Sequence, residues 1–83
     1  MQQNDYAGAE AAFREAIEQR GGDFAFAHYN LGLLYQKTGR TEDAIKEFET
    51  YLQQAPGDEN RYRAENTLRD LRRQAAREKG KQK

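Results

Sequence analysis

The chain of 83 residues lacks cysteine, serine, tryptophan and valine, and it has one histidine and one proline. Without cysteine there is no disulfide framework and no thiolate for catalysis or zinc binding. Without serine there is no serine nucleophile. The single imidazole, His28, does not make a zinc site, because zinc ions in proteins take three or four protein ligands. The composition therefore predicts no catalytic residue, no metal site and no cofactor.

Long hydrophobic runs are also missing. The longest stretch without a strongly polar side chain is 31–35, far short of the roughly 20 apolar residues that cross a bilayer. The first residues, Met1-Gln2-Gln3-Asn4-Asp5, have neither the basic start nor the apolar stretch of a signal peptide. We therefore expect no membrane insertion and a cytoplasmic location.

Helical periodicity runs through most of the chain. Apolar residues recur at the i, i+3, i+4, i+7 spacing of one helix face in four segments, and β-branched residues are scarce. Glycine or proline favours the end of a helix at Gly21-Gly22, Gly39 and Pro56-Gly57. Side-chain oxygens suited to cap the four helix starts belong to Asp5 or Asn4, Asp23, Thr41 and Asp58. The sequence predicts an all-α fold of four helices, with short turns that make neighbours antiparallel.

The sequence also repeats itself. The pair Ala9-x3-Phe13 recurs 35 residues later as Ala44-x3-Phe48. Residues 25–58 carry further spaced hallmarks, which are His28, Leu31, Gly32, Tyr35, Ala44, Phe48 and Pro56. In this spacing the segment resembles the tetratricopeptide repeat, a 34-residue unit of two antiparallel helices. The resemblance covers about two thirds of the chain.

The resemblance implies a short right-handed superhelical stack of antiparallel helix hairpins. It divides a single domain, residues 1–78, into the second helix of a truncated repeat (4–23), a complete repeat (25–58) and a capping helix (59–78), followed by a disordered basic tail (79–83). The last helix is expected to be a cap because Glu65, Asn66 and Arg69 stand where the repeat has leucine, glycine and tyrosine. Two further departures are His28 in place of a large aromatic residue and Tyr51 in place of alanine.

The start of the chain falls within a repeat. By the same resemblance, a full first repeat would place its tyrosine one position before Met1. We expect either that the chain continues a longer array or that a partner supplies the packing of the helix before residue 4.

The resemblance implies a non-catalytic module that binds a protein or peptide in the concave groove. The expected groove residues are Phe26, Tyr29, Leu33, Gln36 and Lys37 on the second helix, and Asn60, Arg63, Thr67 and Asp70 on the fourth. The residues Phe26, Tyr29 and Leu33 form an apolar strip that we expect to be exposed, since exposed apolar patches tend to mark contact sites.

Two alternatives remain open at this point. The first is a homodimer through an exposed face of the first helix, with Phe13 and Ile17 at its centre. The second is nucleic-acid binding by residues 61–83, which carry nine basic and three acidic side chains, whereas residues 1–60 carry five and eleven. No stacking motif accompanies the arginines, so a solubilising cap or an acidic protein partner fits this segment better. The net charge of zero is therefore the sum of an acidic body and a basic end.

Overall fold

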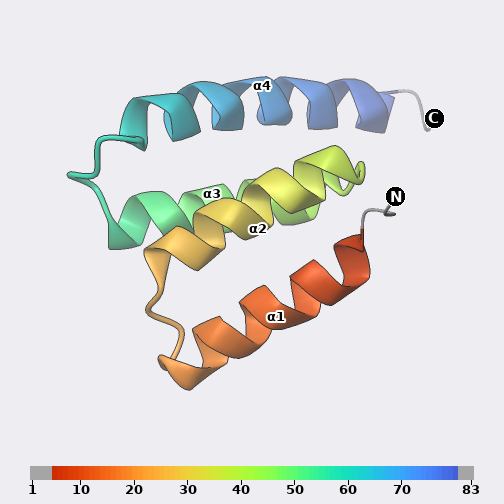
Figure 1. Ribbon diagram of the computed structural model, residues 1–83. Coiled ribbons are helices and arrows are strands. Elements are labelled where there is room, and N and C mark those ends of the chain that lie inside the picture. Colours follow the sequence, from red (N-terminus) through yellow and green to blue (C-terminus); the bar gives the residue numbers. More distant parts are fainter. Residues whose placement is uncertain (1–4, 81–83) are drawn as a thin grey trace.

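The computed structural model describes residues 5–80, and the chain forms four α-helices within them. These are α1 (Tyr6–Gln19), α2 (Ala25–Lys37), α3 (Thr41–Gln54) and α4 (Arg61–Gly80). Each helix runs antiparallel to the one before it (Figure 1). The predicted all-α class with four helices is confirmed, and no strand occurs in the described part of the chain.

The helix ends follow partly from local chemistry. At the start of α1, the Asp5 carboxylate accepts a hydrogen bond from the Gly8 amide at 2.9 Å, as expected for a cap. The turns after α1 and α2 use glycines in the left-handed region, with φ of 91° at Gly22 and 79° at Gly39. The predicted helix stops at these turns are therefore confirmed.

The other predicted caps are wrong. The residues that precede α2 and α3 are Phe24 and Arg40, and neither side chain makes a capping hydrogen bond. Thr41 already lies inside α3 and is buried, with its hydroxyl 3.5 Å from the Gln74 amide nitrogen of α4. Burial and a contact with α4 thus take the place of capping at Thr41. Asp23 is exposed before Phe24 and caps nothing.

The fourth helix also differs from its expected bounds. It spans Arg61–Gly80 rather than residues 59–78, because Asp58 holds the preceding turn instead of capping the helix. Lys79 and Gly80, expected in a disordered tail, are the last residues of α4. The rest of that expected tail, residues 81–83, lies outside the described residues.

The core centres on the α2–α3 hairpin, where the repeat hallmarks meet. Leu31, Tyr35, Ala44 and Phe48 are each exposed by 1% or less. Gly32 allows the two backbones to approach, because a Cβ atom there would lie 2.9 Å from the Phe48 ring. The predicted packing roles of these residues are confirmed. Fully burying a side chain such as Phe48 contributes roughly 1.5–3 kcal/mol.

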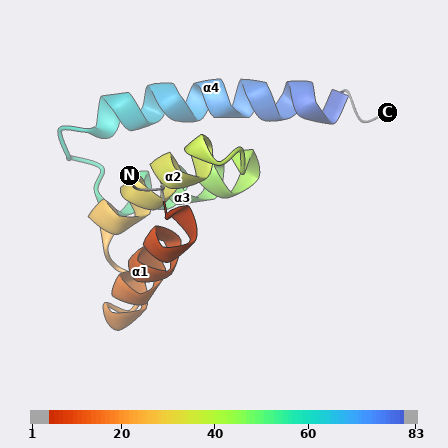
Figure 2. The ribbon, with the colours of Figure 1, turned by 45° about the vertical axis from the view of Figure 1, so that its right-hand side comes forward.

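The outer helices cover this hairpin on two sides. α1 packs against α2, and α4 packs against α3 through Ala64, Leu68 and Leu71. In Figure 2, α4 lies across the hairpin and extends beyond it at its C-terminal end. The result is a stack in which α1 and α4 each have one face toward the core and one face toward solvent.

Candidate partner-binding face

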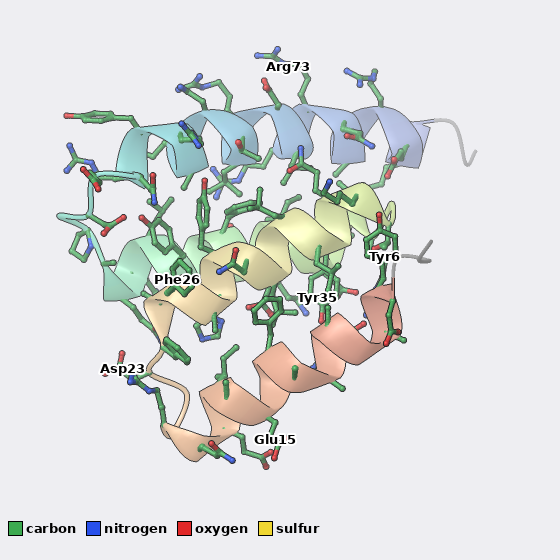
Figure 3. The ribbon with its side chains drawn as sticks, in the orientation of Figure 1. Tyr6, Glu15, Asp23, Phe26, Tyr35 and Arg73 are labelled. Atoms are coloured by element: carbon green, nitrogen blue, oxygen red, sulfur yellow. The ribbon has the colours of Figure 1, made fainter. Side chains whose placement is uncertain are left out.

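The outward side of α2 carries most of the expected groove residues. Phe26 is 64% exposed, and its side chain projects from α2 toward the viewer in Figure 3. Gln36 and Lys37 are also exposed, and Leu33 is half-buried. This arrangement leaves one large aromatic side chain in solvent on a helix whose other large apolar residues are covered.

Tyr29 does not belong to the exposed strip, and the prediction that it would be exposed is wrong. Its exposed fraction is 8%. The Tyr29 ring meets the Phe48 ring edge to face, with centroids 5.7 Å apart, and it lies at a tilt 5.0 Å from the Tyr51 ring. The physical reason is Tyr51, which fills the place of an alanine and gives Tyr29 a second ring to pack against.

A hollow of about 350 Å³ opens between α1 and α2. Leu33 and Leu34 line it from α2, and Phe13 lines it from α1. The sequence reading missed two residues of this hollow, Tyr6 and Asn30. Helical spacing could have found Asn30, because positions 26, 30, 33 and 37 follow one stripe of a helix. The remaining residues of its lining are Asp5, Ala9 and Lys37.

The fourth helix supplies the other expected groove residues. Arg63 and Asp70 are exposed, and Asn60 and Thr67 are half-buried. The Asp70 carboxylate is 4.0 Å from the Arg73 guanidinium one turn later, at an exposed site where such a pair contributes little. Arg63 is an exposed basic side chain near the start of α4.

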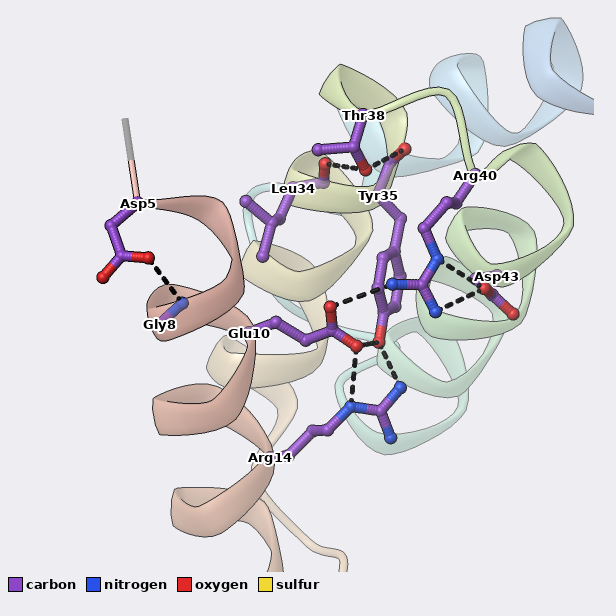
Figure 4. Close-up of polar contacts among 9 residues, drawn as sticks. All are labelled: Asp5, Gly8, Glu10, Arg14, Leu34, Tyr35, Thr38, Arg40 and Asp43. Atoms are coloured by element: carbon purple, nitrogen blue, oxygen red, sulfur yellow. Dashed lines mark hydrogen bonds and ion pairs between the residues drawn. The ribbon is translucent and has the colours of Figure 1, made fainter. Parts of the chain in front are cut away.

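A polar cluster connects α1 with α2 and with the start of α3 (Figure 4). The Tyr35 hydroxyl donates to the Glu10 carboxylate at 3.0 Å and accepts from the Arg14 guanidinium at 2.5 Å. Arg40 donates to the second Glu10 oxygen at 2.9 Å and lies 4.4 Å above the Tyr35 ring. Arg40 also donates a hydrogen bond to the Asp43 carboxylate of α3. The cluster therefore connects three helices through side chains of opposite charge.

The pKa values of this cluster shift in the direction that its geometry dictates. The hydrogen bond from Tyr35, with the nearby Arg14 and Arg40 guanidinium groups, holds the pKa of Glu10 below its ordinary value. Burial raises the pKa of Tyr35, and its bond to the Glu10 carboxylate raises it further. Glu10 is therefore ionised and Tyr35 is protonated at neutral pH.

His28 has a structural role, as the sequence predicted. Its Nδ1 atom lies 2.6 Å from a Glu47 carboxylate oxygen of α3, and its Nε2 atom lies 3.1 Å from the Gly22 carbonyl oxygen. The ring thus connects the turn after α1 with α2 and α3. Within residues 5–80 there is no group of three or more His, Asp or Glu side chains able to hold a metal ion.

A second hollow, of about 700 Å³, lies between α3 and α4. Leu52 and Leu68 form its apolar floor, and an ion pair of 2.7 Å between Glu49 and Arg72 crosses from one helix to the other. The other lining residues are Gln53, Glu65 and Arg69. Their polar side chains agree with the interpretation of α4 as a cap.

The homodimer expected through the first helix stays a prediction, although its two central residues are not fully exposed. Phe13 and Ile17 are both half-buried and pack against the core instead of sharing one exposed face. Phe13 turns toward the hollow shared with α2, whereas Ile17 lines another beside His28 and Leu31. Because they are four residues apart, the two side chains share one face of α1 and lie at successive turns of that helix.

Comparison with known families decides the assignment. The family model described as Tetratricopeptide repeat matches residues 1–59. The chain belongs to the tetratricopeptide repeat family. Repeats of this family generally act as non-catalytic scaffolds for protein–protein contacts, so the chain carries a protein-interaction module with a protein partner. Neither the comparison with curated proteins nor that with solved structures returned a match.

No helix in the described part of the tetratricopeptide repeat chain combines the length and the apolar character needed to cross a bilayer.

Proposed function

We propose that the domain binds an extended or helical segment of a partner protein across the exposed side of α2 and the adjoining side of α4. The observation that carries this proposal is the position of Phe26. It is the large apolar residue of α2 that packing leaves 64% exposed, whereas Tyr29, Leu31 and Tyr35 are buried. An exposed aromatic ring that the fold does not need is a natural anchor for a partner.

The neighbouring side chains suit the recognition of a segment with both apolar and acidic groups. Leu33 continues the apolar surface about two helical turns beyond Phe26 and is half-buried at the edge of the hollow. Lys37 and Arg63 add positive charge on α2 and α4, and both are exposed. These charges would orient an acidic segment and speed its association rather than supply most of the affinity.

The test is a peptide library displayed on phage and selected against the full chain. The affinities of the selected peptides are then measured by fluorescence anisotropy for the protein and its variants. Phe26→Ala should weaken binding by about tenfold or more, which corresponds to losing one anchor residue of an interface. The variant should keep its stability because the side chain is mostly in solvent.

Tyr62→Ala provides the matched control. Tyr62 is an aromatic residue of similar exposure, 66%, but it lies on α4 with the Arg61 guanidinium 4.4 Å from its ring. Its removal should leave the affinities unchanged. The proposal is wrong if Phe26→Ala has no effect, or if both variants weaken binding equally.

A further inference from the structure

The imidazole of His28 is enclosed at the place where the turn after α1 meets α2 and α3. Its side chain is 12% exposed, and that of Glu47, its partner on α3, is 20% exposed. The repeat has a large aromatic residue at this position, which cannot gain or lose a proton as histidine does. Histidine is the side chain that ordinarily changes its charge between about pH 5 and 8, and this chain has one histidine and no cysteine.

Both nitrogens of the His28 ring face oxygen atoms that only accept hydrogen bonds. Nδ1 lies 2.6 Å from the Glu47 carboxylate oxygen, and Nε2 lies 3.1 Å from the Gly22 carbonyl oxygen. A neutral imidazole has one N–H group, so it donates to one of these oxygens while its other nitrogen directs a lone pair at the second. The imidazolium has two N–H groups and donates to both. The arrangement is therefore complete when the ring is protonated.

The contact with the Gly22 carbonyl is the one that a neutral ring gives up. The contact with Glu47 is the shorter of the two and has a charged acceptor, and such hydrogen bonds are the stronger ones. The remaining proton therefore stays on Nδ1, and Nε2 then faces the Gly22 oxygen without a hydrogen. Gln54 donates to the same oxygen at 2.7 Å, so the carbonyl keeps one partner and the turn is loosened rather than released.

We propose that His28 is a pH-dependent link between the α1–α2 turn, residues 20–24, and the α2–α3 hairpin. While the ring holds both protons, it joins Gly22 to Glu47. As the pH rises through the titration of the ring, the Nε2 proton passes to water and the turn loses its hydrogen bond to the ring. The link is thus complete on the acidic side of this titration and weakened on the basic side. It concerns the packing of α1 and does not depend on the proposed binding across α2.

The charged groups around the ring come from α1 and α3. Glu47 of α3 and Glu18 of α1 line the hollow beside His28, together with Arg14 of α1. The Arg14 guanidinium is already paired with the Glu10 carboxylate. A positive charge on His28 therefore meets two acidic groups and a paired cation in this hollow.

The other polar attachment of α1 does not change its charge in the same pH range. The pKa of Glu10 is lowered by its hydrogen bond from Tyr35, and the pKa of Tyr35 is raised by burial. Both residues therefore keep their charge state between about pH 5 and 8. Glu10 lies in the first half of α1, whereas Gly22 follows its C-terminal end. We therefore expect the loosening to be confined to the C-terminal end of α1 and the turn.

The fold contains an internal control for the test. The Gly22 amide donates to the Ile17 carbonyl, five residues earlier, at 2.9 Å. In the turn after α2, the Arg40 amide donates to the Tyr35 carbonyl, also five residues earlier, at 2.8 Å. The two amides thus close turns of the same kind, and His28 bonds to the first of these turns.

The test is amide hydrogen exchange of the full chain, measured by NMR at about pH 5.5 and about pH 8 and corrected for the intrinsic exchange rate at each pH. Spectra of the imidazole nitrogens report the protonation of the ring in the same samples. We expect protons on both ring nitrogens at the lower pH and on Nδ1 alone at the higher pH. The protection factor of the Gly22 amide should fall by about tenfold, as for one lost hydrogen bond, and that of the Arg40 amide should not change.

Two variants assign the effect to the ring at this position. His28→Phe restores the aromatic residue typical of the repeat, and the protection of Gly22 should then be equal at the two pH values. The matched control combines His28→Phe with Tyr62→His, which moves the histidine by 34 residues, one repeat length, to an exposed position on α4. That histidine should titrate without changing the protection of Gly22. The comparison of Gly22 with Arg40 in the wild type needs no variant.

The contrary outcomes are equally defined. The inference is overturned if the Gly22 and Arg40 amides lose protection equally, or if Gly22 keeps its protection after the ring has lost a proton. It is also overturned if the ring carries a single proton at about pH 5.5, or if His28→Phe retains the pH dependence. These measurements contain no ligand, so their outcome is separate from that of the proposed function.

Discussion

The Tyr51 hydroxyl donates a hydrogen bond of 2.5 Å to the Asp58 carboxylate, so a buried residue of α3 holds the turn that leads into α4. The other contact of that carboxylate oxygen is the Asn60 amide, at 3.0 Å. Both bonds hold the pKa of Asp58 below its ordinary value, with Tyr51 as the larger cause. Burial, together with the Asp58 charge, raises the pKa of Tyr51.

Removing the Tyr51 hydroxyl should make the free energy of unfolding depend less on pH in the acidic range. Because the pKa of Asp58 is lower in the folded state, its carboxylate stabilises the fold above the unfolded value of about 3.9. That contribution is lost as the pH falls through the folded pKa. Tyr51→Phe should therefore be less stable than the wild type at pH 7, and the difference should shrink toward pH 2. Urea unfolding followed by circular dichroism measures it; a constant difference would contradict the prediction.

Gly32→Ala should destabilise the α2–α3 hairpin. The added Cβ atom would lie 2.9 Å from the buried Phe48 ring, and such overpacking costs about 1–3 kcal/mol. The better helix propensity of alanine offsets about 1 kcal/mol of this cost, so we expect a net loss of up to about 2 kcal/mol in the free energy of unfolding. Gly57→Ala is the control, since a Cβ atom there meets nothing within 4 Å. Equal effects of the two substitutions would show that close packing is not the cause.

Tyr35→Phe should loosen α1. The ring stays in the core, but the hydroxyl that joins Glu10 and Arg14 is lost, which should cost about 1 kcal/mol. Hydrogen exchange followed by NMR should show faster exchange in α1 than in α3, because the lost bonds connect α1 to the hairpin. Tyr62→Phe removes an exposed hydroxyl and should change neither quantity. Uniform acceleration across all helices would argue against a local role for the cluster.

His28→Gln should weaken the contact among α2, α3 and the turn after α1. A glutamine amide can reach only part of the span between Glu47 and the Gly22 carbonyl oxygen, which the imidazole bridges at 2.6 and 3.1 Å. We expect a loss of about 1–2 kcal/mol in the free energy of unfolding at neutral pH. Glu47→Gln, which keeps the shape but removes the charge, should lose part of the same energy. Additive losses in the double variant would show that the two residues do not interact.

The repeat pattern could be predicted from the sequence because it reports pairwise packing that recurs in every unit. Leu31, Gly32, Tyr35 and Phe48 lie in the core at the positions that their spacing required. Helix stops at glycines were equally predictable, since backbone conformation is a local property. The family match over residues 1–59 reflects the same pattern.

The features that could not be predicted from the sequence depend on contacts between residues that are distant in the chain. Tyr29 is buried because Tyr51, 22 residues later, presents a ring to it. Thr41 fails as a cap because Gln74 of α4 lies against it. The hollow between α1 and α2 lies between residues of two helices, and no local propensity encodes how two helices pack.

The separation of charge along the stack makes the molecule an electric dipole of zero net charge. Residues 5–60 carry five basic and eleven acidic side chains, whereas α4 carries seven basic and three acidic ones, among them Arg73, which points away from the body in Figure 3. The electric field of a charged partner exerts a torque on such a dipole, so the protein is oriented before the two molecules make contact. The α1 end would lead the approach to a cationic surface and α4 would lead it to an anionic one. Both an anion exchanger and a cation exchanger would then retain this neutral protein at low salt. The anion exchanger would bind its acidic end and the cation exchanger its basic end.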